Sequence, residues 1–204
     1  NYTANMYMTL NYLKTRMSKG GAIVYCTSTA GLEWKRFKKE QNKVVHASTW
    51  EEVVAATAKL AKKAPATFAY MYSKRCLSEF ACEQAVEFAK LGIRINNVLP
   101  GSTDTGMKQE FQDMIGSEEN LIAQAGLAGR LATPEEMAAP MVFLNSPMAS
   151  FIIGVDLVVD YADTCLKELG LKKNLEAVSA TNPIICAMAK KMMAKSAKEA
   201  SEKK

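Results

Sequence analysis

Two short apolar segments most constrain how this chain can fold. Residues 22–26 follow a Gly-Gly pair, and residues 93–99 follow a single glycine. Near-continuous apolar runs of this length are typical of strands buried on both faces of a parallel sheet. Apolar residues at helical spacing precede each run, over residues 1–18 and 68–90. The alternation predicts an α/β protein with a parallel sheet, right-handed crossovers, and ligands at the carboxyl ends of the strands.

The rest of the chain continues this alternation. The sequence from Thr49 to Glu52 forms a capping box, which predicts a helix beginning there. Residues 104–126 are predicted to form one or two short helices broken at Gly116. Thr133-Pro134-Glu135-Glu136 predicts the start of a helix that ends at Leu144. A last strand is predicted over residues 152–160.

Size and charge exclude several classes of protein. With 204 residues and 49% apolar composition, the chain can bury a sizeable core as one domain. Its apolar runs are shorter than the roughly 20 residues that a membrane-spanning helix needs. Residues 187–204 contain six lysines and two glutamates, so they carry +4 of the net charge of +5. Because the remaining body is close to neutral, the sequence does not indicate a nucleic-acid interface.

The cysteines and the single histidine indicate the compartment and argue against a metal. The five cysteines are odd in number and lie mostly in apolar periodic segments, which favours buried, reduced thiols in a cytoplasmic protein. One histidine and no clustered ligands give no support to a zinc site.

Polar residues with possible chemical roles follow the predicted strands or open a helix. Tyr70 and Lys74 are four residues apart and therefore lie on one helix face. A nearby ammonium group is expected to lower the pKa of a tyrosine, which suits an acid/base role. Ser28 follows the first strand and can bind a carbonyl or alcohol oxygen, although a strand-ending turn also explains it. Thr27 and Thr29 are alternatives for this role.

A second strand end carries Pro100 and Gly101, followed by Thr105. The glycine allows the backbone to approach a ligand closely, and the threonine hydroxyl can donate a hydrogen bond. An ordinary strand-to-helix turn is the alternative interpretation.

These motifs, in this order, resemble the short-chain dehydrogenase/reductase family from residue 1 to about residue 160. The matching segments are Gly21-Ala22-Ile23-Val24 through Ser28-Thr29-Ala30-Gly31, Tyr70-Met71-Tyr72-Ser73-Lys74, Gly92-Ile93-Arg94-Ile95-Asn96, Pro100-Gly101 with Thr105, and Gly129-Arg130 with Pro134-Glu135-Glu136. The resemblance implies a Rossmann-like, doubly wound parallel sheet and an oxidoreductase that uses NAD or NADP to interconvert a secondary alcohol and a ketone. It also implies a homo-oligomer and no metal.

The resemblance implies a role for each matching residue. Tyr70 would be the catalytic acid/base, and Ser28 would orient the substrate oxygen. Lys74 would bind the nicotinamide ribose and lower the Tyr70 pKa, while Asn1 would complete a proton relay. Tyr70 and Lys74 would also contact the cofactor, as would four residues after the second strand. These are Pro100, Gly101, Thr103 and Thr105.

The chain departs from the family pattern in three places. Tyr70 lies 42 positions after Ser28 (70 − 28), because residues 33–65 look like an insertion. With an insertion at this place, the chain resembles a bacterial subgroup of the family that includes 3α-hydroxysteroid dehydrogenase/carbonyl reductase. Asp160 is followed by Tyr-Ala, where the family has two glycines. The glycine-rich turn that holds the pyrophosphate is not found in the sequence, so we expect the N-terminal βαβ half of the fold to be absent from this chain.

The resemblance also suggests a division of the chain and a substrate. Residues 1–165 are expected to be the C-terminal part of one Rossmann-like domain, with a substrate loop over 102–127, and residues 166–204 an extension with a basic tail. An apolar substrate such as a steroid or bile acid is expected, or alternatively a small carbonyl compound. A truncated, non-catalytic interaction module is the competing hypothesis. For the tail itself, residues 195–204, we expect a frayed end rather than an amphipathic helix.

Overall fold

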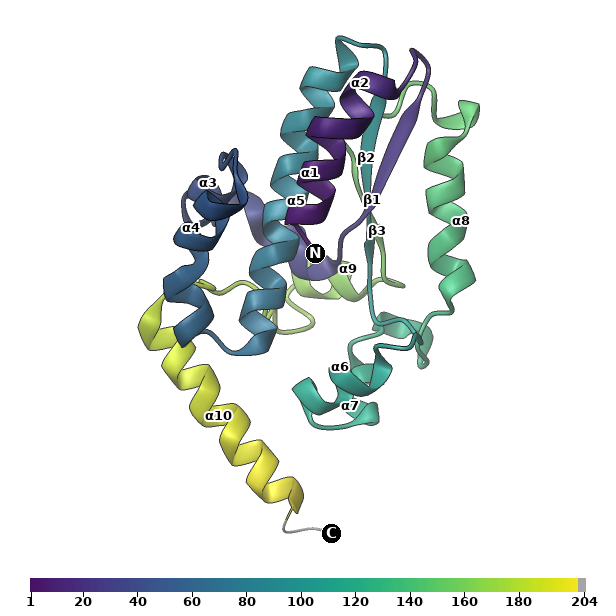
Figure 1. Ribbon diagram of the computed structural model, residues 1–204. Helices are drawn as coiled ribbons and strands as arrows, with labels where there is room; N and C mark the ends of the chain where they lie inside the picture. The colour runs from purple at the N-terminus through teal and green to yellow at the C-terminus, as the bar shows by residue number, and fades with distance from the viewer. Residues whose placement is uncertain (202–204) are drawn as a thin grey trace.

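Three parallel strands form the centre of the molecule (Figure 1). They are β1 (Ala22–Cys26), β2 (Arg94–Pro100) and β3 (Asp156–Val159), in the order β1-β2-β3. The structure is a computed structural model that describes residues 1–201, without the side chains of residues 59, 61, 63 and 195–201. The predicted α/β class with a parallel sheet is confirmed. The last strand is shorter than the predicted 152–160, because the Asn96 side chain, rather than the backbone of β2, binds the Ile152 carbonyl and the Val155 amide.

One face of the sheet is covered by the N-terminal helices and by the long helix α5 (Ala66–Ala89). The first helix consists of α1 (Thr3–Met8), a wider π-helical turn over Thr9–Leu13, and α2 (Lys14–Arg16). The Thr9 hydroxyl donates to the Asn5 carbonyl at 2.7 Å, within the helix ladder, which is a known cause of such a local change. The main apolar core lies between these helices and the sheet. Its fully buried members include Cys76, Leu77, Phe80, Phe88 and Ile95.

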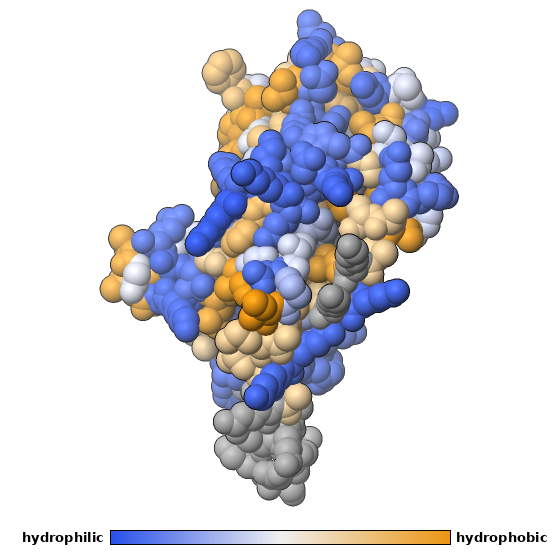
Figure 2. Space-filling model, turned by 90° about the vertical axis from the view of Figure 1, so that its left-hand side faces the viewer, coloured by the Kyte–Doolittle hydropathy of each residue, from blue (hydrophilic) through white to orange (hydrophobic). Residues whose placement is uncertain are grey.

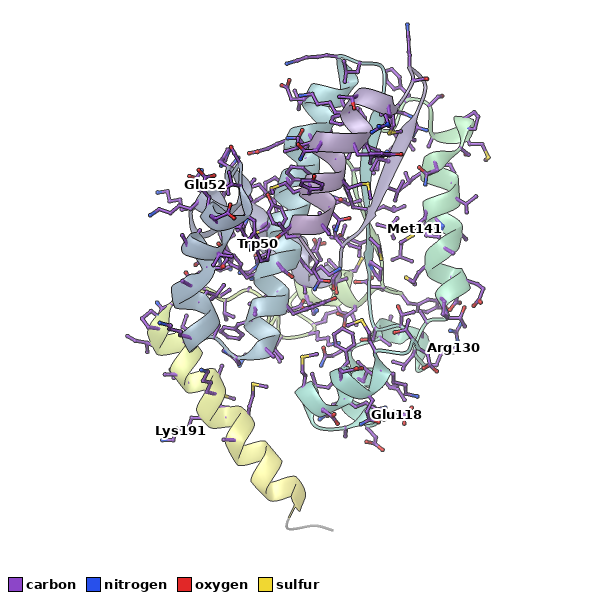
Figure 3. All side chains as sticks on the ribbon, viewed as in Figure 1. Trp50, Glu52, Glu118, Arg130, Met141 and Lys191 are labelled. Carbon is purple, nitrogen blue, oxygen red and sulfur yellow. The ribbon has the colours of Figure 1, made fainter. Side chains whose placement is uncertain are left out.

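The opposite face of the sheet is covered by α8 (Pro134–Asn145), so helices lie on both faces, as a doubly wound fold requires. The predicted capping box is present: the Thr133 hydroxyl accepts from the Glu136 amide, and the Glu136 carboxylate accepts from the Thr133 amide. A second apolar core, centred on Val98, Leu144 and Ala149, lies between α8, the short helical turn Pro147–Ala149 and the sheet. Figure 3 shows Met141 on this helix, directed toward the sheet.

The segment between Ser28 and α5 is helical throughout most of its length. A 3-10 helix, η2 (Thr29–Lys35), is followed by α3 (Lys38–Val45) and α4 (Trp50–Lys63). The capping box predicted at Thr49 is confirmed, and Figure 3 shows Glu52 and Trp50 at this end of α4. The sequence did not predict η2 or α3, because residues 33–43 are mostly charged and show no apolar periodicity. The structure nevertheless buries Trp34, Val44 and Val45.

The segment after β2 forms a small unit of its own. It contains α6 (Lys108–Ile115), α7 (Glu118–Ala123) and a 3-10 turn, Gly126–Ala128. The predicted break at Gly116 is confirmed, and this glycine has a left-handed φ of 99°. A third apolar cluster holds the unit together. Its members are Phe111, Ile115, Leu121, Ile122, Ala125 and Leu131.

The C-terminal part contains α9 (Asp163–Glu168) and α10 (Pro183–Ser201). The expectation of a frayed end is wrong for residues 195–201, which belong to α10, while residues 202–204 lie outside the described part. In Figure 1, α10 extends away from the sheet beside α4. Figure 2 shows the side of the molecule on which α3, α4 and α10 lie, with hydrophilic groups interrupted by apolar patches.

All five cysteines are free thiols. The expectation that most of them are buried is wrong: Cys76 and Cys186 are buried, but Cys26 and Cys165 are exposed and Cys82 is partly exposed. Cys26 is exposed because it ends an edge strand, where one side of the backbone has no neighbouring strand among residues 1–201. In this same part of the chain, no helix combines the length and the apolar character that crossing a bilayer requires.

Candidate active site

Ser28 lies directly after β1 and begins the η2 helix. Its side-chain oxygen accepts a hydrogen bond from the Ala30 amide at 3.2 Å, so the serine is the N-cap of that helix. The preceding residue, Thr27, is buried and bonds to the Val98 carbonyl through both its amide and its hydroxyl, at 2.9 and 3.1 Å. Thr27 is therefore fixed to the neighbouring strand, which leaves Ser28 as the residue at the strand end that faces α5.

A close contact at Gly31 places η2 against α5. A Cβ atom at this position would lie 2.7 Å from the Ser78 Oγ and 3.0 Å from the backbone oxygen of Lys74. Since real Cβ atoms do not approach so closely, only glycine allows the two helices to meet here. This contact brings Ser28, three residues before Gly31, to the face of α5 that carries Tyr70. The structure therefore places these two predicted site residues side by side, and a side-chain interaction between them acts on the Tyr70 pKa.

Lys74 is largely buried on the same helix face, one turn after Tyr70. Its Nζ donates to the Cys26 carbonyl oxygen at 3.1 Å and lies 5.6 Å from the centre of the Tyr70 ring. An ammonium group has three donors, so Lys74 can bind further oxygens without losing this hydrogen bond. The predicted trio of Ser28, Tyr70 and Lys74 is thus brought together.

The predicted lowering of the Tyr70 pKa is not seen in this structure. Burial raises the pKa of Tyr70 above its ordinary value, and this effect outweighs the lowering by Ser28. Lys74 does not lower it, because its ammonium group is directed to a backbone carbonyl at the end of β1. Burial in turn lowers the pKa of Lys74. Here Tyr70 is therefore held as the protonated phenol, ready to donate a hydrogen bond or a proton.

The structure does not bring Asn1 to this trio. Asn1 is exposed at the start of α1, and its backbone carbonyl accepts from the Asn5 side chain at 2.6 Å. None of the contacts found among the described residues joins Asn1 to Ser28, Tyr70 or Lys74. Its role in a proton relay remains a prediction.

The predicted residues after β2 lie at the carboxyl end of the sheet, as expected. The amide of Gly101 bonds to the Val159 carbonyl at 2.9 Å, and a Cβ here would lie 2.8 Å from the Asp160 side chain. The Thr103 hydroxyl donates to the Gly101 carbonyl at 3.0 Å, while the exposed Thr105 accepts from the Met107 amide. The Thr103 hydroxyl is thus used within its own turn, whereas the exposed Thr105 hydroxyl only accepts a hydrogen bond here and can still donate one to a ligand.

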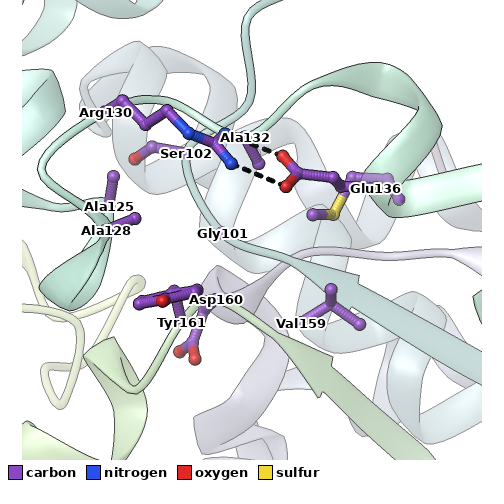
Figure 4. Close-up of a pocket in the computed structure, with 11 residues that line it drawn as sticks. Gly101, Ser102, Ala125, Ala128, Arg130, Ala132, Glu136, Val159, Asp160 and Tyr161 are labelled. Carbon is purple, nitrogen blue, oxygen red and sulfur yellow. Dashed lines mark hydrogen bonds and ion pairs between the residues drawn. The ribbon is translucent and has the colours of Figure 1, made fainter.

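A cavity of about 140 Å³ opens beside Gly101 (Figure 4). The Arg130 guanidinium forms a bidentate pair with the Glu136 carboxylate at 2.7 and 2.8 Å along one edge of it. This pair holds the pKa of Glu136 down at about 2. Asp160 and Tyr161 lie on the opposite side. Figure 3 shows Arg130 near the unit that carries Glu118 on α7.

The turn after β3 keeps the shape of a glycine turn without the glycines. Tyr161 and Ala162 have φ values of 49° and 72°, a left-handed conformation that is uncommon for residues other than glycine. Gly126 packs against this turn, and a Cβ on it would overlap the Tyr161 carbonyl at 2.2 Å. Both residues of this turn are therefore held in a conformation that glycine adopts more readily, and Tyr161 adds a side chain to the cavity beside Gly101.

The unit formed by α6 and α7 reaches Tyr70, one of the candidate site residues. The Phe111 ring meets the Tyr70 ring edge to face, with 5.5 Å between the ring centres. An apolar side chain thus lies against the candidate acid/base. That residues 102–127 cover the substrate stays a prediction.

Comparisons with known proteins decide the family. Residues 35–161 match a family model described as enoyl-(acyl carrier protein) reductase, a branch of the short-chain alcohol dehydrogenases. The chain belongs to the short-chain dehydrogenase/reductase family. This confirms the resemblance inferred from the motifs.

Several members of the family are similar to this chain. Coniferyl-alcohol dehydrogenase from Pseudomonas is 33% identical over 164 residues, which are 78% of this chain and 62% of that protein. The 3α-hydroxysteroid dehydrogenase/carbonyl reductase of Comamonas testosteroni is 34% identical over 92 residues, or 45% and 36% of the two chains. Across the eight curated relatives compared, this chain spans between 34% and 62% of the relative's length.

Solved structures of the family share the fold. The 3α-hydroxysteroid dehydrogenase of Pseudomonas sp. B-0831, crystallised with NADH, has a TM-score of 0.61 at 24% identity, covering 76% of this chain and 59% of that one. The landomycin C-6 ketoreductase LanV, with bound NADP and rabelomycin, has a TM-score of 0.51 at 24% identity, covering 77% and 46%. NAD and NADP both occur in the family, in agreement with the expected cofactors.

Sequence reasoning missed one prominent residue beside the trio. Arg75, directly after Lys74, is fully buried and binds backbone carbonyls of residues 176 and 178. The sequence does contain a sign of this residue: an arginine lies in a mainly apolar stretch of a predicted helix. A buried charge requires partners, so such an arginine indicates specific contacts.

The close contact at Gly31 gives a direct test of how the site is positioned. Replacing Gly31 with alanine should lower the free energy of unfolding by about 1–3 kcal/mol, because the new methyl group overpacks a backbone contact. Gly106→Ala is the matched control, since a Cβ there meets no atom within 4 Å. Chemical denaturation measures both; equal stability of the two variants would show that the contact is not tight.

The state of the Tyr70 phenol gives a pH test. In the cofactor-free protein, the difference in absorbance near 295 nm between wild type and Tyr70→Phe should rise only above pH 10, since burial favours the neutral phenol. The stability that this neutral phenol contributes is complete below the unfolded-state pKa of about 10 and is lost as the pH rises through the folded-state value. A midpoint below pH 10 would contradict the assignment.

Proposed function

We propose that the protein is an NAD(P)-dependent oxidoreductase that interconverts a secondary alcohol and a ketone, with Tyr70 as the acid/base. The observation that carries the proposal is the grouping of Ser28, Tyr70 and Lys74 at the carboxyl end of β1, between η2 and α5. Ligands of open α/β sheets bind at this edge.

The residues present fit a nicotinamide nucleotide at this edge. Lys74 has unused donors for a ribose hydroxyl pair, and the backbone from Gly101 to Thr103 lies beside the same strand ends. When bound, the nicotinamide ring would supply or accept the hydride. Membership of the family, in which NADH and NADP are both bound, supports this assignment.

The chain's own residues would handle the proton and the substrate oxygen. The Tyr70 phenol, kept neutral by burial, would donate its proton to the developing alkoxide during ketone reduction and take it back during alcohol oxidation. The Ser28 hydroxyl would donate a hydrogen bond to the same oxygen. The ammonium of Lys74 would stabilise the phenolate that remains, once it turns from the Cys26 carbonyl toward the phenol.

An apolar substrate, such as a steroid or bile acid, is proposed for this site. The Phe111 ring against Tyr70 and the apolar cluster of α6 and α7 support it, as does the similarity to a 3α-hydroxysteroid dehydrogenase/carbonyl reductase. An aromatic alcohol is the second candidate, because coniferyl-alcohol dehydrogenase is similar over 78% of this chain.

The proposed division of the chain follows from the same site. Residues 1–165 are proposed to belong to one Rossmann-like domain with an insertion at 33–65 and a substrate segment at 102–127, and residues 166–204 to extend it. The full-length protein is proposed to associate with copies of itself. Three exposed large side chains of the N-terminal helical segment support this, namely Tyr7, Met8 and Tyr12.

Replacing Tyr70 with phenylalanine tests the function. In the full-length protein, the variant should lose about 10²- to 10⁴-fold in kcat for reduction of a steroid ketone by NAD(P)H and for oxidation of the matching secondary alcohol by NAD(P)+, as expected for loss of a general acid/base. Fluorescence titration should show NAD(P)H binding within a few-fold of wild type. Tyr12→Phe, at an exposed tyrosine of the N-terminal helical segment, is the control. Unchanged turnover in the Tyr70 variant would refute the role, and cofactor binding by the wild type without any turnover would favour a non-catalytic module.

A further inference from the structure

Arg75 is a buried cation next to the catalytic lysine. Its side chain is 0% exposed, and the two terminal nitrogens donate to the Glu176 carbonyl at 2.6 Å and to the Val178 carbonyl at 3.1 Å. The guanidinium lies 4.3 Å from the centre of the Phe37 ring, which comes from the insertion. A buried charge is costly unless it has partners, and here the two carbonyls and the Phe37 ring supply them, whereas the Nε has no hydrogen-bond partner among the described residues.

The two carbonyls belong to an irregular segment, residues 171–180, which we call the strap. It runs between α9 and α10 without forming a helix or a strand. Backbone carbonyls in such a segment need partners from elsewhere. Arginine suits this task because its planar fork can hold two acceptors at once, which a lysine does less well.

The strap is tied at further points around the active site. The Nζ of Lys172 donates to the Ala123 carbonyl, at the end of α7, at 2.7 Å, and also pairs with the buried Asp163. The Asn174 side chain donates to the Glu33 carboxylate, in the helix that begins after Ser28, at 2.8 Å. The strap therefore connects the substrate segment, the Ser28 helix and the catalytic helix.

The strap also passes near the candidate acid/base. The carboxylate of Glu176 pairs with Lys167 at 3.1 Å, and its negative charge contributes to raising the Tyr70 pKa. Its side chain keeps 30% of its surface exposed, so the strap borders a region that solvent can reach.

We propose that Arg75 is a positioning residue that fastens the strap across α5, so that the strap forms a wall of the substrate site that a large substrate would contact. The proposal rests on the proposed function for the substrate part. The fastening of the strap is independent of it. In this arrangement, Arg75 also couples the insertion to the active site, because the same guanidinium lies between Phe37 and the strap.

The test compares Arg75→Met with Arg16→Met, the same change at an exposed arginine of α2. In the full-length protein, trypsin should cut after Lys172 and Lys173 about tenfold faster in Arg75→Met, because charged hydrogen bonds to the strap are lost. The KM for 5α-androstane-3,17-dione should rise about tenfold with kcat changed little, and the KM for cyclohexanone should stay near that of wild type. Arg75→Lys should recover part of both effects.

A second variant guards against misfolding. Asn174→Ala removes the tie to Glu33 without touching the core of α5, and it should shift the tryptic rate and the steroid KM in the same direction by a smaller factor. An unchanged tryptic rate in both variants would overturn the proposal, as would equal effects on the two ketones. If wild type reduces neither ketone, the proposed function fails, while the tryptic rates still decide whether Arg75 fastens the strap.

Discussion

The site depends on the close approach of η2 to α5 at Gly31. Ser28 and Tyr70 are far apart in the sequence, and a long helical insertion separates them. They meet because a residue without a side chain lets the backbone after β1 lie directly on the catalytic helix. Any side chain at position 31 would separate the two surfaces and widen the distance between Ser28 and Tyr70.

Burial is the main influence on the pKa values of Tyr70 and Lys74 at this site. Tyr70 is kept as a neutral phenol, and the charge of Lys74 is held by the carbonyl that ends β1. The Lys74 ammonium group therefore binds the backbone at the end of β1, beside the Tyr70 ring, and does not bind the Tyr70 hydroxyl. A ligand that offers oxygen acceptors to the ammonium would compete with the Cys26 carbonyl. In the proposed function, such a ligand would free the ammonium group to act on the Tyr70 phenol.

Much of this arrangement could be predicted from the sequence, because it rests on local patterns. Apolar runs after glycines predicted the strands, and capping boxes at Thr49 and Thr133 predicted two helix starts. The spacing of Tyr70 and Lys74 predicted their shared face. The protonation state of Tyr70 could not be predicted, because it depends on how deeply the phenol is buried. The hydrogen bonds from Arg75 to the strap could not be predicted either. Their acceptors are backbone carbonyls, which every residue carries and which therefore leave no pattern in a sequence.

We propose that Ser28, Tyr70 and Lys74 support a proton transfer that accompanies direct hydride transfer between cofactor and substrate. The most direct measurement follows the hydride itself, using full-length protein, a steroid ketone, and NADH or NADPH deuterated at either face of C4. A fixed site presents one face of the ring to the substrate. We therefore expect one of the two labelled forms to give an alcohol with deuterium on the carbinol carbon, and the other to give unlabelled alcohol. Equal labelling from both faces, or alcohol without deuterium from either, would contradict the account.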